Sequence, residues 1–278
     1  MDILNYTFFQ HALLGVMFVS LASAIIGTYV VSRRMVFITG GITHACFGGL
    51  GLGFYLGANP IAIAGAFAVA SAVGVEWMAN RYKVREDSAI GVVWALGMAL
   101  GTIFIFLSPG YVPELTSFLF GNVLTITTTD IVMFAIFLAI LLLFFTAFYH
   151  PIVSCAFDRD FATTRALPAN AINMAMTVMI AVCIVLTIRL IGIMLLMSLL
   201  TMPQMIAELF TIRLRPMMAI SAAVSLTCSV LGLFCSYWIA VPASATIVLL
   251  LISAYILARL AKRFNPIRAL GLGRISEF

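Results

Sequence analysis

This chain of 278 residues has little charge. Only 9% of its residues are Asp, Glu, Lys or Arg, whereas 64% are hydrophobic, and its mean hydropathy is +1.18. Soluble domains carry about 25% charged residues, so this composition cannot cover a water-facing surface. The shortage of charge excludes an ordinary soluble protein and predicts a surface that faces lipid.

Other absences narrow the class further. The sequence has no alternating ten-residue strand patterns, which excludes an outer-membrane barrel. It has no GxxxxGK[ST], HExxH or GxSxG motif and no paired intramembrane carboxylates at catalytic spacing. The five cysteines lack CxxC spacing and are expected to act as small apolar residues. Energy for any work must therefore come from another chain or from an ion gradient.

What the sequence has is a series of apolar runs, each about as long as a bilayer-spanning helix. Such a run satisfies its backbone polar groups internally, which lipid requires. We expect an all-α, polytopic bundle of nine transmembrane helices, plus or minus one, near residues 8–32, 35–57, 60–80, 88–108, 130–149, 169–189, 191–210, 216–238 and 240–258.

The basic residues predict an orientation. Fourteen of the fifteen Lys and Arg residues fall on one side of this threading, and only Arg189 falls on the other. The positive-inside rule then places the N-terminus outside and the C-terminus in the cytoplasm. The net charge of +5 is spread over short loops and a tail, so it does not indicate nucleic acid. The first segment lacks a basic flank and a cleavage site, which favours a retained helix.

Two joints are ambiguous. The segments on either side of Arg189 are almost contiguous and predict either a tight hairpin or a bent helix. Residues 109–129 are broken by Pro and Gly and are expected to form an outer loop with a short partial helix. Residues 1–278 are expected to form a single transmembrane domain with a basic cytoplasmic tail at 259–278. The longest inside loop, 150–168, is the expected docking place for a protein partner.

Four charges lie in or near the apolar segments. A charge deep in a bilayer usually faces the bundle interior, so each is a functional candidate by default. Most lie near predicted segment ends, which favours an interfacial or snorkelling role instead. The four are Glu76, Asp130, Arg189 and Glu208.

His44 is the most informative single residue. It lies in the glycine-rich segment GGITHACFGGLGLG at 40–53, where small residues allow helices to approach closely and can also line a narrow pathway. The imidazole is a candidate metal ligand or proton carrier. Composition alone favours a histidine that hydrogen-bonds across helices. His11 and His150 are expected at the membrane interface.

The inside loop carries FDRDFATTRALP at 157–168. Phe157 and Phe161 are four residues apart and would share one face of a short amphipathic helix. That face needs a cover, either the lipid headgroup layer or a groove on a soluble partner.

Six blocks in order resemble the membrane-spanning permease of zinc/manganese/iron-type ABC importers: SRRMVFITGGITHA, REDSAIG, ELTSFLFGNVLTITTTD, FDRDFA, GIMLLMSLLTMP and VPASATIVL. The resemblance covers about residues 10–258. It implies a type II ABC importer permease-like fold in a bacterial cytoplasmic (inner) membrane. It also implies a homodimer, two cytosolic ATPase subunits that hold the ATP, and an extracytoplasmic metal-binding protein. The chain itself would bind no cofactor and would not be an enzyme, and its cargo would be a divalent metal.

The resemblance also suggests site residues. A coupling helix near 157–167 would fit into the ATPase through Phe157, Asp158, Arg159, Asp160, Phe161 and Ala162, although Ala166 replaces the usual glycine. His44, Thr43 and Gly40 would line the metal pathway. The family typically has an acidic residue at the position of Gly40, so this chain keeps only the nitrogen ligand.

Three acidic residues are secondary candidates: Glu86, Asp87 and Glu208. Glu208 stands where the family commonly has a basic residue. It could attract a divalent cation at the cytoplasmic exit, but we favour an ion pair with Arg213.

Two functions remain open from the sequence. The leading hypothesis is a permease that moves a zinc, manganese or iron ion into the cytoplasm by ATP-driven alternating access. The alternative is a secondary transporter or channel for metal ions or protons. The interrupted stretch at 191–203 supports the alternative weakly, and the lack of an internal repeat opposes it.

Overall fold

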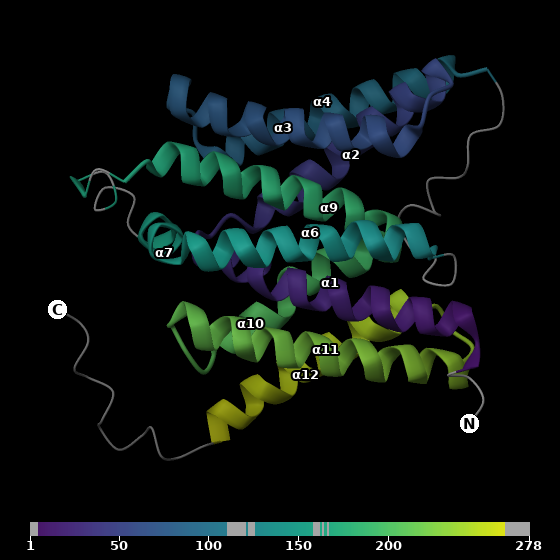
Figure 1. The fold of residues 1–278 in the computed structure, drawn as a ribbon, viewed down its shortest axis with the longest axis vertical. Helices are drawn as coiled ribbons and strands as arrows, with labels where there is room; N and C mark the ends of the chain where they lie inside the picture. The colour runs from purple at the N-terminus through teal and green to yellow at the C-terminus, as the bar shows by residue number, and fades with distance from the viewer. Residues whose placement is uncertain are drawn as a thin grey trace.

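The computed structural model describes residues 5–109, 121, 126–157, 162, 164–165 and 167–264. Within these residues every regular element is a helix (Figure 1). The helices are α1 (Thr7–Ser32), α2 (Val36–Leu56), α3 (Pro60–Tyr82), α4 (Glu86–Leu107), α6 (Thr128–Ala147), α7 (Tyr149–Phe157), α9 (Ala169–Leu199), α10 (Met202–Glu208), α11 (Leu214–Ile239) and α12 (Ala243–Phe264). The predicted all-α membrane bundle is confirmed.

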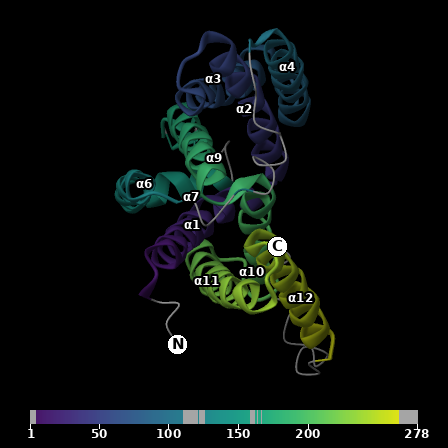
Figure 2. The ribbon, with the colours of Figure 1, turned by 90° about the vertical axis from the view of Figure 1, so that its right-hand side faces the viewer.

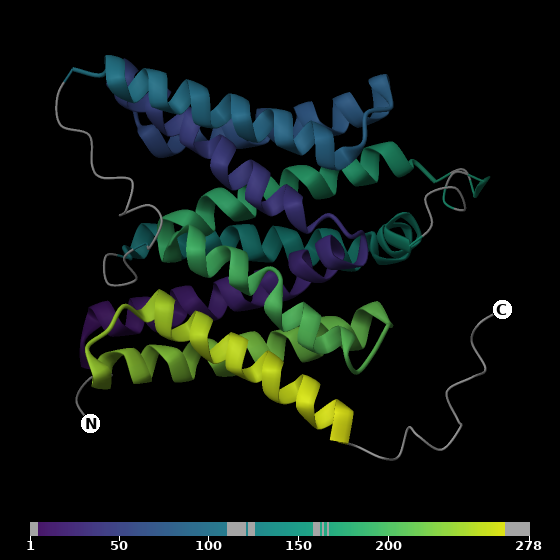
Figure 3. The same cartoon turned by 180° about the vertical axis from the view of Figure 1, so that it is seen from behind.

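Eight helical units in the described residues are long and apolar enough to cross a membrane. One of them, Ala169–Glu208, has 40 residues and would measure about 60 Å if straight, twice the thickness of a bilayer core. It does not run straight, because Gly192 has φ 79° and ψ 171°, a conformation that glycine adopts without strain. The chain turns back there, so both ends of the unit lie at the same end of the bundle (Figure 3). This unit would cross the membrane twice and the other seven once, which agrees with the predicted nine crossings. Of the two alternatives for the segments around Arg189, a tight hairpin or a bent helix, the structure has the hairpin.

Local sequence explains where the helices begin and end. Gly57, with φ 63°, ends α2 in the left-handed conformation. Two residues later the Asn59 side chain accepts hydrogen bonds from the first free N–H groups of α3, and Pro60 occupies the first helical turn. The α2–α3 connection is therefore determined by short-range chemistry.

The inside loop differs from the expectation. Residues 150–168 were expected to be a loop, but α7 occupies its first part, because Tyr149–Phe157 is apolar enough on one side to pack against α9 and α6. Of the six residues expected to couple to the ATPase, Phe157 and Ala162 are described. Asp158, Arg159, Asp160 and Phe161 lie outside the described residues, as does most of the outer stretch 109–129.

The helices form three groups along the long axis of the molecule. α2, α3 and α4 pack together at one end, and α10, α11 and α12 at the other (Figure 1). Between them lie α1, α9 and α6, and α6 stands out on one side of the bundle (Figure 2). α9 contacts α2 and α3 of one outer group and α10 and α12 of the other, as well as α1 and α6, which makes it the most central helix.

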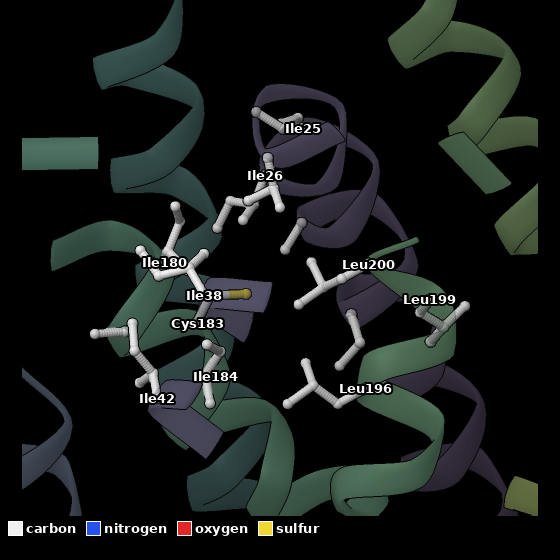
Figure 4. Packing of buried hydrophobic residues seen from close by; sticks show 14 of the residues in the cluster. Ile25, Ile26, Ile38, Ile42, Ile180, Cys183, Ile184, Leu196, Leu199 and Leu200 are labelled. Atoms are coloured by element: carbon white, nitrogen blue, oxygen red, sulfur yellow. The ribbon is translucent and has the colours of Figure 1, made fainter. Parts of the chain in front are cut away.

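The core lies where α1, α2 and the two arms of α9 meet (Figure 4). Lipid offers no hydrophobic driving force between helices, so close packing and interhelical hydrogen bonds hold this contact together. Isoleucines of α1, α2 and the outgoing arm of α9 face leucines of its return arm: Ile25, Ile26, Ile38, Ile42, Ile180, Ile184, Leu196, Leu199 and Leu200.

Serine side chains join α1 to α11. Ser20 Oγ lies 3.2 Å from Ser229 Oγ, and Ser225 Oγ donates to the Ser20 carbonyl at 3.1 Å. Gln204 of α10 donates to the Ser23 carbonyl at 2.8 Å. Small polar residues let these backbones approach and then hydrogen-bond across the helices.

Candidate transport pathway around His44

The glycine-rich segment of α2 is packed between α3 and α4. A Cβ placed on Gly48 would lie 2.9 Å from the carbonyl oxygen of Gly97 in α4. A Cβ on Gly49, on the opposite side, would lie 2.6 Å from the Cα of Ala64 in α3. Such distances leave no room for a side chain, so the glycines allow three backbones to meet at close range.

His44 lies on a face of α2 that turns toward α4. Its ring stacks on the indole of Trp94, with ring centroids 4.4 Å apart and planes 7° from parallel. The side chain is half-buried. Among the described residues neither ring nitrogen has a hydrogen-bond partner, so the expected cross-helix hydrogen bond is not found there. The nitrogens are left available to a ligand.

Gly40 lies one helical turn before His44, on the same face. A Cβ at Gly40 would be 3.2 Å from Cε of Met197 and 3.6 Å from Cζ3 of Trp94. The face therefore looks toward α4 and the return arm of α9. Gly40, where the resemblance led us to expect an acid, is bordered by an indole and a thioether.

The donor set at this face is sparse. The described residues contain no group of three His, Cys, Asp or Glu side chains that could hold a metal ion. Imidazole nitrogen and thioether sulfur are ligands of borderline and soft character, and neither carries a charge. Such a site can touch a passing cation but lacks the carboxylates that would retain a hard one.

The third predicted pathway residue, Thr43, and the secondary candidates do not share this face with His44. Thr43 is buried, and its hydroxyl donates to the Thr39 carbonyl of its own helix. Asp87 is exposed in the first turn of α4. Glu208 is exposed and borders a hollow of about 520 Å³ together with Arg33, Arg34 and Phe157. Within the described residues Glu208 forms no ion pair, so the expected pair with Arg213 is absent.

A polar cluster joins three helices at the end of the bundle where α9 begins. Arg33 pairs with Glu86 at 3.2 Å and donates to the Tyr29 hydroxyl at 3.2 Å. Tyr29 in turn donates to Oδ1 of Asn173, also at 3.2 Å. Burial lowers the pKa of Arg33, but Tyr29 and Glu86 outweigh it and leave that pKa above its usual value. The cluster thus ties α1 and the start of α4 to the start of α9.

Helix α4 connects this polar cluster to His44. Glu86, Ile90 and Trp94 recur every four residues and so share one face of α4. Glu86 holds Arg33, Ile90 fits against Gly41 of α2, and Trp94 stacks on His44. One face of α4 therefore contacts both the polar cluster and the imidazole.

At the opposite end Arg189 and Asp130 form an ion pair. Arg189 Nε lies 2.7 Å from Asp130 Oδ1, and the Asp130 side chain is only 5% exposed. The other oxygen, Oδ2, completes a capping box with Thr127 at the start of α6. The sequence indicated each charge separately, whereas their partnership depends on tertiary contact across 59 residues of chain.

The turn of α9 is closed by a second glycine. A Cβ on Gly121 would overlap Gly192 and Ile191, and it would lie 2.7 Å from the Gly192 Cα. Gly121 itself has φ 62°. The α9 reversal thus packs directly against this residue of the connection between α4 and α6.

A multi-pass helical bundle with a reversed helix and a histidine between glycine-packed helices defines a membrane transport protein. The chain belongs to the ABC 3 transport family, whose sequence pattern matches residues 5–262. It is 33% identical to a probable metal transport system membrane protein of Chlamydia pneumoniae, over 89% of this chain and 87% of that protein. It is 29% identical to the manganese transport system membrane protein MntC of Halalkalibacterium halodurans, over 92% and 88%.

A solved structure has the same fold. A chain of PsaBC from Streptococcus pneumoniae, in complex with a Fab, superposes with a TM-score of 0.82 and 26% sequence identity. The match covers 96% of this chain and 97% of that chain. The predicted membership of an ABC transporter permease family is confirmed.

Proposed function

We propose that this chain is the permease of an importer that moves a divalent metal ion into the cytoplasm, driven by ATP hydrolysis on separate subunits. The proposal of a metal cargo rests on the His44 ring. Its nitrogens have no hydrogen-bond partner among the described residues, and it lies on the close-packed face of α2. Relatives named as metal and manganese transport proteins support it.

The proposed assembly contains two copies of the permease, two cytosolic ATPase subunits and an extracytoplasmic protein that delivers the metal. The N-terminus lies outside and the C-terminus in the cytoplasm, which places the basic clusters and residues 157–167 on the side where ATP is available. A symmetric partner would bring a second His44 to the pathway, so that two imidazoles compensate in part for the acid missing at Gly40.

The transport step uses the path from the polar cluster to His44. Closure of the ATPases on residues 157–167 displaces the start of α9, which is bonded through Asn173 and Tyr29 to Arg33. Because Arg33 also holds Glu86, α4 moves with them and carries Trp94 relative to His44. Uncharged ligands release a cation readily, which suits a pathway that passes metal rather than stores it.

The test is metal uptake by the full complex carrying His44→Ala. We expect uptake of radioactive manganese or zinc to fall strongly, while assembly and ATP hydrolysis by the partner persist. Cys46→Ala is the matched control, because Cys46 is buried two residues away on the same helix and is expected to keep wild-type uptake. Wild-type uptake by the His44→Ala complex would remove His44 from the pathway.

A further inference from the structure

A second hollow lies between α7 and the start of α11, at the same end of the bundle as the polar cluster. Its volume is about 530 Å³. It is lined by Tyr149, His150, Val153, Phe157, Ile212, Arg213, Leu214, Arg215 and Pro216. Its lining comes from α7 on one side and, on the other, from the first turn of α11 and the two residues before it.

The charge in this hollow has one sign. Arg213 and Arg215 are exposed, and His150 adds a third group that can carry a proton. In the described part of the chain neither arginine has an acidic partner within 4.0 Å. Two arginines that line one hollow, with no carboxylate within 4.0 Å in the described residues, favour an anionic ligand, and the guanidinium fork matches phosphate oxygens.

The position of Arg215 is fixed by an aromatic ring. Its guanidinium carbon lies 4.3 Å above the centroid of Tyr149, a cation–π contact that bridges α11 and α7 across the hollow. The guanidinium forms no ion pair within the described residues, so its N–H groups can donate to a ligand. Arg215 is therefore oriented as well as charged.

Apolar side chains extend from the hollow along the outside of the bundle. Ile212 is 79% exposed and Phe157 is 56% exposed, both at its border. α6, which leads directly into α7, carries an exposed apolar stripe of Ile136, Ile140 and Leu143, spaced by four and three residues. A basic pocket bordered by exposed apolar side chains, on the helix that follows the apolar face of α6, matches a headgroup followed by acyl chains.

We propose that this hollow, defined by Tyr149, His150, Arg213 and Arg215, binds the headgroup of an anionic phospholipid, with its acyl chains along α6. Basic pockets between transmembrane helices are known to hold such headgroups. The site does not depend on the transported cargo. Only its assignment to the cytoplasmic leaflet depends on the proposed orientation.

The test compares phosphatidylglycerol with phosphatidylcholine of identical acyl chains, bound to the purified full-length permease and counted by native mass spectrometry. Each arginine near the membrane surface contributes roughly a fivefold gain, so Arg213→Ala/Arg215→Ala should lower the phosphatidylglycerol preference by about thirtyfold. Arg213→Lys/Arg215→Lys keeps both charges but loses the guanidinium fork, so it should retain more of the preference than the alanine pair and less than the wild type. High salt should weaken the wild-type preference.

The matched control is Arg81→Ala/Lys83→Ala, which removes two exposed charges from the end of α3 and should keep the preference. If the alanine pair does not fold, Arg213→Gln/Arg215→Gln replaces it. The proposal is overturned if the Arg213/Arg215 pair binds phosphatidylglycerol like the wild type, or if both charge-removal pairs lose it equally. It is also overturned if millimolar inorganic phosphate displaces the lipid, or if the Arg213/Arg215 variant loses only the partner ATPase.

Discussion

Removing Arg189 should destabilise the protein, and removing the charge of Asp130 as well should restore much of the loss. The Asp130 side chain is only 5% exposed, and in Arg189→Ala its Oδ1 would lose its charged partner. Breaking a buried pair from one side costs about 3–5 kcal/mol. Because the Arg189 side chain is 36% exposed, we expect the lower end, about 3 kcal/mol.

Asp130→Asn should lower the free energy of unfolding by less than Arg189→Ala does. The asparagine keeps an oxygen that can accept the Thr127 bonds of the capping box, and the partly exposed Arg189 can turn toward water. We expect a loss of about 1 kcal/mol, in the range of a weakened helix cap. In Arg189→Ala/Asp130→Asn no charge is left buried, so the double variant should be more stable than Arg189→Ala alone.

The assay is thermal unfolding of the purified permease in detergent. About 3 kcal/mol corresponds to a fall in Tm of about 6 °C for Arg189→Ala, and the double variant should recover more than half of it. Arg81→Ala is the matched control, since Arg81 is exposed and has no ion pair among the described residues, and it should leave Tm unchanged. Additive losses in the double variant would refute the reasoning, because they would mean that the two charges do not interact.

Three further predictions concern the pathway and the helix that leads to it. Gly40→Asp adds a carboxylate one turn before His44, and its Cβ would lie 3.2 Å from the flexible end of Met197. It should raise the metal retained by purified protein about tenfold or more, because even residues that only orient a metal ligand change metal affinity by about that factor. Elemental analysis equal to the wild type would contradict this. Glu86→Gln should lower metal uptake while ATP hydrolysis by the partner continues, because it removes the ion pair that holds α4 to Arg33. Equal loss of uptake and ATP hydrolysis in a coupled assay would count against the path from the polar cluster through α4 to His44. Gly97→Leu forces a side chain against the α2 backbone and should cost about 1–3 kcal/mol or more, visible as a lower Tm; an unchanged Tm would show that α2 and α4 separate easily.

Most of the helices could be predicted from the sequence because lipid imposes simple length and composition rules. The apolar run at 60–80 corresponds to α3 at Pro60–Tyr82, and the run at 216–238 to α11 at Leu214–Ile239. The ambiguity around Arg189 could not be resolved in this way, since both a hairpin and a bend fit the same composition. The positive φ of Gly192 produces the hairpin. A glycine adopts positive and negative φ about equally readily, so its presence in a sequence does not predict which one it has.

The candidate site was predicted only in part. His44 and the glycine segment carry a local signal, and their place in α2 followed from it. The stacking of Trp94, the approach of Met197 to Gly40 and the pairing of Arg189 with Asp130 join segments far apart in the chain. Such contacts depend on how helices pack, and the sequence pattern of a single helix contains no record of its neighbour.

The energy source of transport tests the central claim most directly. The permease is reconstituted in liposomes with and without its ATPase partner, and uptake of radioactive manganese and zinc is measured with ATP on the ATPase side. The account predicts uptake only when both the partner and hydrolysable ATP are present. Metal uptake by the permease alone, down its gradient or coupled to protons, would contradict it.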